Sequence, residues 1–224
     1  MAKFKHGFFL SIYVVFGIAL FFIRGQATTK TQPDTGQSYL QDRALISLSD
    51  KLESFGEIHG NFTEILKDPN QGVLQKSHGR FWIKKPCFFK WQVISPNKQL
   101  LLSDGKKLWH YDEILEQVTV QKVPDMLSEA PYLLLLTGNR QKLKQLFTVE
   151  ALKQERYRLT PKSDHQNLIQ HIDLQFSGKT LQALSIKTQT GQSTAIDFSH
   201  IRFSNIPESV FHFTPPEGAD ILGA

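Results

Sequence analysis

The sequence contains a single cysteine, Cys87, among its 224 residues. Because a second thiol is missing, no disulfide can form within the chain, and the fold must depend on the packing of apolar side chains. Hydrophobic residues make up 40% of the chain and charged residues 21%, which are the proportions of a globular protein. The length suits one sizeable domain with a core of its own.

The sequence also lacks the short motifs that mark common catalytic and cofactor sites. It has no HExxH, CxxC, GxSxG or GxGxxG pattern, and its eight histidines are scattered singly without metal-ligand spacing. We therefore expect no enzyme activity, no catalytic residue, no metal and no cofactor. One alternative stays open: Cys87 would serve as the nucleophile of a hydrolase if the fold placed a histidine base beside it.

The N-terminus has the pattern of a secretory signal peptide. Lys3 and Lys5 precede an uninterrupted apolar stretch at residues 7–23, and the small residues Gly25 and Ala27 follow it. We expect cleavage after Ala27, so that residues 1–27 are removed and the rest of the chain crosses the inner membrane. The alternative is an uncleaved anchor, since this stretch is at the short limit for spanning a membrane.

Little net charge remains once residues 1–27 are removed. Lys3, Lys5 and Arg24 lie in that segment, so 26 basic residues become 23 against 21 acidic ones. This balance, without a long basic block, gives no reason to expect nucleic acid as a partner. Cys87 lies far beyond the signal, so it is not the lipid-modified cysteine that directly follows a lipoprotein signal.

Apolar periodicity predicts three helices. A polar leader at residues 28–37 precedes a helix at 38–55, a second helix follows Pro124 and ends at Gly138, and a third occupies 140–147. The apolar residues that we expect these helices to direct at the rest of the protein include Leu45, Leu48, Met126, Leu133, Leu134 and Leu136.

Between and after the helices the apolar period changes to two, which predicts strands. Turn signals such as Asp104-Gly105 and Thr190-Gly191 separate them, and the last expected strand is residues 211–218. The count is about eleven strands in one mainly β domain, residues 38–224, with the helices inserted at one end. Because a sheet of that size must curl, we expect an incomplete antiparallel β-barrel.

Residues 81–93, FWIKKPCFFKWQV, combine apolar and basic side chains. Alternate residues of a strand share one face, so the odd positions form an apolar face with Lys85 in its middle. If register is kept across Pro86, the apolar members of that face are Phe81, Ile83, Phe89, Trp91 and Val93, with Cys87 as a small side chain among them.

Lys85 admits two interpretations. A buried ammonium is costly unless it is paired, and a barrel covered by helices would offer carbonyl oxygens at helix C-termini as partners. In the other interpretation Pro86 ends the strand and Lys85 points to solvent. The residues of the segment favour neither.

The order and spacing of several motifs resemble the outer-membrane lipoprotein carrier (LolA) family over nearly all of residues 38–221. The matching residues are Lys85-Pro86, Phe89, Trp91, Asp104-Gly105-Lys106, Leu108-Trp109 and Tyr111, followed by Phe211, Phe213, Pro215, Pro216 and Gly218. The resemblance implies an incomplete barrel of about eleven strands covered by a lid of three helices. It also implies a monomeric periplasmic chaperone whose cavity holds the acyl chains of lipoproteins.

The resemblance further implies two protein partners and a latch. Cargo would come from an inner-membrane ABC transporter of the LolCDE type and pass to an outer-membrane receptor of the LolB type. Lys85 stands where the family has an arginine that bonds lid backbone, and lysine lacks the planar fork of arginine. The short tail after Gly218 leaves the extra terminal strand of carriers in question. The alternatives are a LolB-type receptor and a periplasmic binding or sensing module for a small apolar or lipid ligand.

Overall fold

The computed structural model describes residues 35–123, 139–162 and 169–223. The expected signal peptide and most of the expected leader lie outside these residues, as does the expected second helix with Met126, Leu133, Leu134 and Leu136. Within the described ranges, no helix is both long enough and apolar enough to cross a membrane.

The described residues include two α-helices. Helix α2 (Thr35–Glu53) begins slightly before the expected start at residue 38, and helix α4 (Arg140–Leu146) lies where the third helix was predicted. The Asn139 side chain accepts a hydrogen bond from the backbone N–H of Lys142 at 3.0 Å, which satisfies one of the free donors at the start of α4. Of the expected lid of three helices, the described residues therefore include two.

The strands follow the predicted alternation closely. They are β1 (Glu57–Lys67), β2 (Val73–Lys84), β3 (Phe88–Ser95), β4 (Gln99–Asp104), β5 (Lys107–Asp112), β6 (Gln117–Lys122), β7 (Phe147–Leu152), β8 (Arg156–Pro161), β9 (Ile169–Ser177), β10 (Thr180–Thr188), β11 (Ser193–Phe203) and β12 (Asp220–Leu222).

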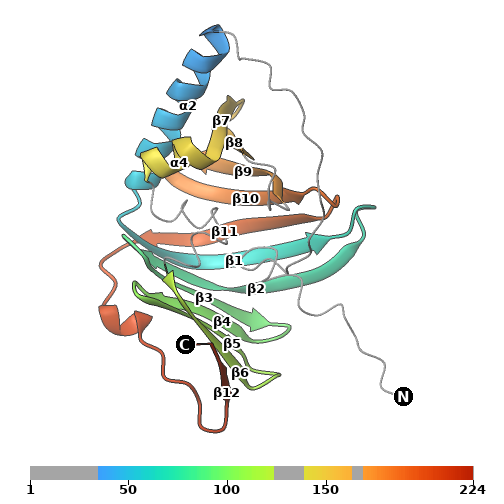
Figure 1. Ribbon diagram of the computed structural model, residues 1–224, viewed down its shortest axis with the longest axis vertical. Helices are drawn as coiled ribbons and strands as arrows, with labels where there is room; N and C mark the ends of the chain where they lie inside the picture. The colour runs from blue at the N-terminus through green and yellow to red at the C-terminus, as the bar shows by residue number, and fades with distance from the viewer. Residues whose placement is uncertain (1–34, 124–138, 163–168, 224) are drawn as a thin grey trace.

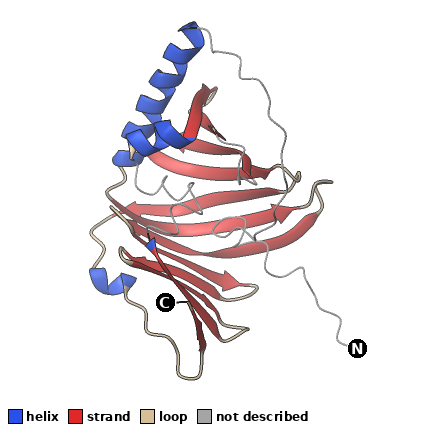
Figure 2. Ribbon diagram, viewed as in Figure 1, coloured by secondary structure: helices blue, strands red, loops and turns tan. Residues whose placement is uncertain are grey.

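The twelve strands of the described residues belong to one open sheet, in the order β12-β6-β5-β4-β3-β2-β1-β11-β10-β9-β8-β7. Neighbours are antiparallel except β12, which lies parallel to β6. Figure 1 shows α2 and α4 near the β7 end of the sheet and β12 at the opposite end. Figure 2 shows that strands make up much more of the described structure than helices do. The expected curled sheet is present as a large open sheet whose edge strands β7 and β12 do not pair with each other.

The C-terminal segment differs from its prediction. Residues 211–218 do not form a strand: a 3₁₀ helix, η2 (Glu208–Phe211), is followed by an irregular stretch with Pro215 and Pro216. Adjacent prolines supply no N–H donors, which explains why this alternating segment does not pair. The terminal strand is instead β12, so the described sheet has one strand more than the predicted number of about eleven.

The two faces of the sheet differ in what covers them. The inner face carries the main hydrophobic core, into which α2 inserts Ala44, Leu45, Leu48 and Leu52. On the opposite, outer face the C-terminal segment packs against β3 to β5, where the ring centroids of Phe88 and Phe211 are 5.6 Å apart. Fully burying an aliphatic side chain contributes about 1.5–3 kcal/mol, so these two layers account for much of the stability.

Candidate functional site

The central strands bring the expected apolar residues to the inner face. Phe81 and Ile83 on β2 lie opposite Trp91 and Phe89 on β3, so the odd register continues across the turn that contains Pro86. Phe81, Phe89, Trp91 and Val93 are at most 7% exposed, and Ile83 packs against them.

An aromatic cluster forms at the centre of this face. The rings of Phe62 and Trp91 are stacked with centroids 3.8 Å apart, and Phe198 meets Phe81 edge to face at 5.1 Å. Offset and edge-to-face pairs of this kind add to the stabilisation that comes from buried area. Phe62 on β1 and Phe198 on β11 were not among the predicted residues. Period-two alternation within β1 and β11 could have predicted that both side chains face inward, but it could not have predicted that they contact Trp91.

Two glycines make room for this cluster. Gly79 lies opposite Phe62 in the β1–β2 pair, and a Cβ at Gly79 would come within 2.6 Å of the Phe62 ring and 2.0 Å of the Gln92 carbonyl oxygen. Gly60 lies opposite Phe81 in the same way. Each large ring therefore occupies the space that a side chain on the neighbouring strand would fill.

Helix α2 lies over one part of the inner face. Leu45 and Leu48, two of the predicted helix residues, are 5% and 0% exposed. Phe55, just after the helix, stacks on Phe176 of β9 at 5.9 Å between ring centroids, and Tyr157 of β8 meets Phe176 edge to face. The apolar stripe of α2 thus covers the β7 to β9 part of the sheet.

Lys85 contacts the C-terminal end of α2. It lies in the turn between β2 and β3, and its ammonium donates a hydrogen bond to the carbonyl oxygen of Leu52 at 2.6 Å. The last carbonyls of a helix have no partners within the helix and carry the negative end of its dipole, so a cation is favourable there. Both earlier interpretations were partly right: the strand ends before Pro86, and Lys85 nevertheless finds a helix carbonyl.

Two features of the surroundings act on the charge of Lys85 in opposite directions. Burial lowers the pKa of the Lys85 ammonium, and the nearby Glu53 carboxylate raises it. The Lys85 ammonium is partly desolvated, and one backbone oxygen accepts its hydrogen bond. Water can replace that oxygen at a modest cost in free energy.

Cys87 follows Lys85 in the same turn. It is half-buried and packs against the core cluster. Burial raises the pKa of its thiol, and Lys142 opposes the shift. Because the thiolate is the nucleophilic form, this environment does not activate Cys87 for catalysis.

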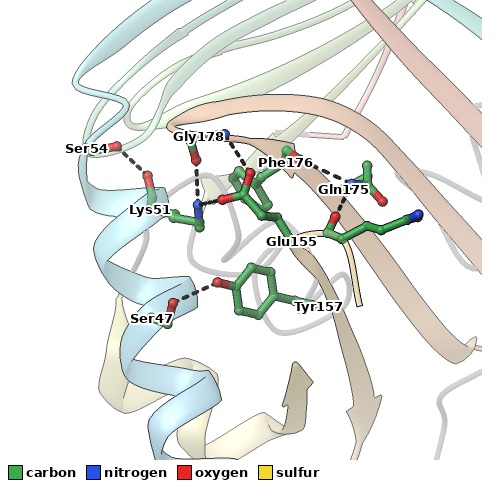
Figure 3. A network of polar contacts seen from close by, with 9 residues as sticks. Ser47, Lys51, Ser54, Glu155, Tyr157, Gln175, Phe176 and Gly178 are labelled. Carbon is green, nitrogen blue, oxygen red and sulfur yellow. Dashed lines mark hydrogen bonds and ion pairs between the residues drawn. The ribbon is translucent and has the colours of Figure 1, made fainter. Parts of the chain in front are cut away.

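A second set of polar contacts joins α2 to turns of the sheet (Figure 3). The Lys51 ammonium donates to the Glu155 carboxylate at 2.8 Å and to the Gly178 carbonyl oxygen, and it lies over the Phe176 ring. The backbone N–H of Gly178 donates to the other Glu155 oxygen, and Ser47 bonds the Tyr157 hydroxyl. We call Lys51, Glu155 and Gly178 the α2 anchor. It joins the helix to the β7–β8 and β9–β10 turns.

Comparison with known proteins identifies the family. Residues 53–214 match the family described as outer membrane lipoprotein carrier protein LolA. An outer-membrane lipoprotein carrier protein of Francisella tularensis subsp. novicida is 36% identical over 181 residues, which cover 80% of this chain and 87% of that protein. The carrier protein of Chromohalobacter salexigens is 35% identical over 175 residues, 76% of this chain and 82% of its own.

One solved structure has a similar fold. A crystal structure of an uncharacterized conserved protein from Thermus thermophilus aligns with a TM-score of 0.51 at 10% sequence identity, covering 79% of this chain and 97% of that one. The apolar inner face and the helix that covers part of it are consistent with the family that the sequence matches identify. The chain belongs to the LolA family of outer-membrane lipoprotein carrier proteins.

Proposed function

We propose that this protein is a periplasmic chaperone that carries acylated lipoproteins between the inner and outer membranes. The observation that supports this function best is the inner face, where Phe81, Phe89 and Trp91 form a continuous apolar surface beside α2. Each acyl chain of about fifteen methylenes costs on the order of 12 kcal/mol to expose to water, at roughly 0.8 kcal/mol per methylene. A carrier must therefore supply an apolar surface of this kind.

In this proposal the empty protein shields its own inner face. Leu45 and Leu48 of α2 cover part of the face, together with the predicted helix that contains Met126, Leu133, Leu134 and Leu136. When cargo arrives, acyl chains replace helix side chains against Phe81, Ile83, Phe89, Trp91 and Val93. Because one apolar contact replaces another, the exchange is close to balanced, which lets the protein both accept and release its cargo.

Lys85 is the latch in this proposal. Its hydrogen bond to Leu52 closes the C-terminal end of α2 over the sheet, and its loss frees the helix to move. A hydrogen bond from a charged group contributes about 1.5–3 kcal/mol when well formed, which biases closure without preventing opening. The α2 anchor at Lys51 is a second contact in the same turn of the helix, and it joins that turn to the β7–β8 and β9–β10 turns.

The partners proposed for a monomeric carrier are an inner-membrane lipoprotein-releasing ABC transporter and an outer-membrane receptor. The experiment is to add the protein, purified from a periplasmic extract, to spheroplasts with radiolabelled lipoproteins. We expect a soluble complex of labelled lipoprotein with this chain, and no complex when the transporter's ATPase is inactivated. A protein that binds an apolar dye but releases no lipoprotein would instead be a binding module for a small apolar ligand.

A further inference from the structure

The outer face of β2 carries a row of cations interleaved with apolar side chains. Ser77, Gly79 and Phe81 point to the inner face, so the residues between them point outward. The outward row of β2 is Leu74, Lys76, His78, Arg80 and Trp82, of which the first four are exposed and Trp82 is half-buried.

A second row crosses the first at Trp82. Strand pairing aligns Arg202 of β11 with His59 of β1, His59 with Trp82, and Trp82 with Lys90 of β3. Neighbouring strands are about 4.8 Å apart, so these four side chains stand in line on one face. The Lys90 ammonium lies 5.3 Å from the Trp82 ring centroid, a cation–π contact that orients both groups outward. We call the two rows together the outer basic surface.

The outer basic surface has a clear excess of positive charge. On the outward faces of β11, β1, β2 and β3, all of which are described, the acids are Glu57 and Asp197. Glu57 forms an ion pair with Lys84 at 3.4 Å and accepts a hydrogen bond from the backbone N–H of Ile206. Its charge is therefore already paired, and it holds the C-terminal segment against β1. On these four strands Asp197 is then the one remaining acid against five cations, Lys67, Lys76, Arg80, Lys90 and Arg202, although the whole chain after residue 27 is nearly neutral.

This composition fits a lipid surface better than a folded ligand pocket. Figure 1 shows β11, β1, β2 and β3 side by side in the middle of the sheet, so the surface is broad. Lysine and arginine bind lipid phosphates, and a tryptophan with exposed aliphatic neighbours is typical of the headgroup level of a membrane. Leu74 and Ile94, at 52% and 39% exposed, add aliphatic side chains to the same face, four or more residues along their strands from the Trp82–Lys90 pair.

We propose that the outer basic surface docks on anionic phospholipid headgroups. This inference rests on the proposed carrier function, because a protein that collects acylated cargo has to work against a membrane. The docked face is opposite to the face proposed for acyl chains, so the protein remains on the bilayer with its inner face and α2 accessible to a transporter.

The test measures co-sedimentation of the periplasmically purified chain with phosphatidylcholine vesicles, with and without an equimolar amount of phosphatidylglycerol. We expect binding only with phosphatidylglycerol, weakened by added salt because the charges are exposed. Each Lys or Arg near an anionic surface contributes about 1 kcal/mol, so reversing three of them should weaken binding on the order of a hundredfold. The test variant is Lys76→Glu/Arg80→Glu/Arg202→Glu.

The matched control reverses three exposed lysines elsewhere, Lys106→Glu/Lys122→Glu/Lys153→Glu, with an identical change in net charge. We expect the control to bind more tightly than the test variant by at least tenfold. Equal loss in both variants would mean that net charge alone attracts the protein, and absence of binding by the parent chain would also overturn the proposal. Retention of the parent by an acidic protein without vesicle binding would assign the surface to a protein partner and refute the lipid assignment.

Failure of the docking proposal can be distinguished from failure of the proposed carrier function. Vesicle binding is measured without lipoprotein, and each variant is also loaded with detergent-solubilised lipoprotein in the absence of membranes. The test variant should retain cargo as the parent does, because its substitutions lie on the opposite face from Trp91. Loss of vesicle binding with normal loading supports the docking surface. Failure of loading in the parent would count against the carrier function alone.

Discussion

The ammonium of Lys85 lies 2.6 Å from the carbonyl oxygen of Leu52, so the turn after β2 is joined directly to the last turn of α2. The two residues are 33 positions apart in the chain. This contact places a side chain from the β2–β3 turn at the negative end of a helix that covers part of the same sheet.

The first prediction concerns this contact. Lys85→Met should weaken the closed position of α2, because the C-terminal carbonyl of the helix loses its cationic donor. We expect faster hydrogen exchange in α2 and several-fold greater uptake of an apolar fluorescent probe. Lys85→Arg should retain closure, since a guanidinium also donates to backbone oxygens.

Lys76→Met is the matched control for Lys85→Met, because Lys76 is an exposed lysine on the outer face of β2. It should leave probe uptake unchanged. Equal uptake by the Lys85→Met variant and the parent would show that Lys85 does not control closure.

The second prediction uses a pair of tryptophans on opposite faces. Trp91 belongs to the inner aromatic cluster, whereas Trp109 lies on the outer face against Phe213. Trp91→Leu should reduce the lipoprotein retained per folded molecule several-fold, because the acyl chains lose a large apolar contact. Trp109→Leu should not, and a loss of the same size in both variants would point to general destabilisation.

The third prediction tests the close packing behind the aromatic cluster. Gly79→Ala should lower the free energy of unfolding by roughly 1–3 kcal/mol, since the new methyl group would clash with Phe62 and with the Gln92 backbone. Gly56→Ala is the control, because no atom lies within 4 Å of a Cβ built there. Denaturant titration measures both, and a Gly79→Ala protein as stable as the parent would contradict the assigned packing.

The fourth prediction concerns pH and the α2 anchor. Hydrogen bonds from Lys51 and from the Gly178 backbone hold the pKa of Glu155 below its ordinary value of 4.5. A carboxylate with a lowered folded pKa stabilises the fold above its unfolded pKa, and that contribution is lost as pH falls through the folded value. The parent should therefore exceed Glu155→Gln in thermal stability at neutral pH, and the gap should close below pH 4.5. A gap that is constant with pH would exclude a role for the Glu155 charge.

The sequence predicted local features of this fold well. Alternation located nearly all strands, and the parity of residues 81–93 correctly placed Phe81, Ile83, Phe89, Trp91 and Val93 on one face. It succeeded across Pro86 because β2 and β3 form a hairpin in which Ile83 pairs with Phe89. The Asn139 cap of α4 is also a local feature, because capping depends on neighbours in the chain.

Contacts between segments that are distant in the chain could not be predicted from the sequence. Phe88, at an even position of residues 81–93, lies on the outer face, where it is covered by Phe211, more than a hundred residues later. The partners of Lys51 and Lys85 were hidden for the same reason, since any of several helix ends or turns offers a suitable oxygen. The parallel β12 follows from where the C-terminal segment crosses the sheet, which no local pattern encodes.

The central claim is that the inner face holds the acyl chains of the cargo. The most direct measurement is photo-crosslinking of a lipoprotein labelled in its acyl chains to carriers with a photoreactive phenylalanine analogue at position 91 or at position 109. The account predicts a crosslink from position 91 and none from position 109, because the two positions lie on opposite faces. Crosslinking from position 109 alone, or equally from both positions, would contradict it.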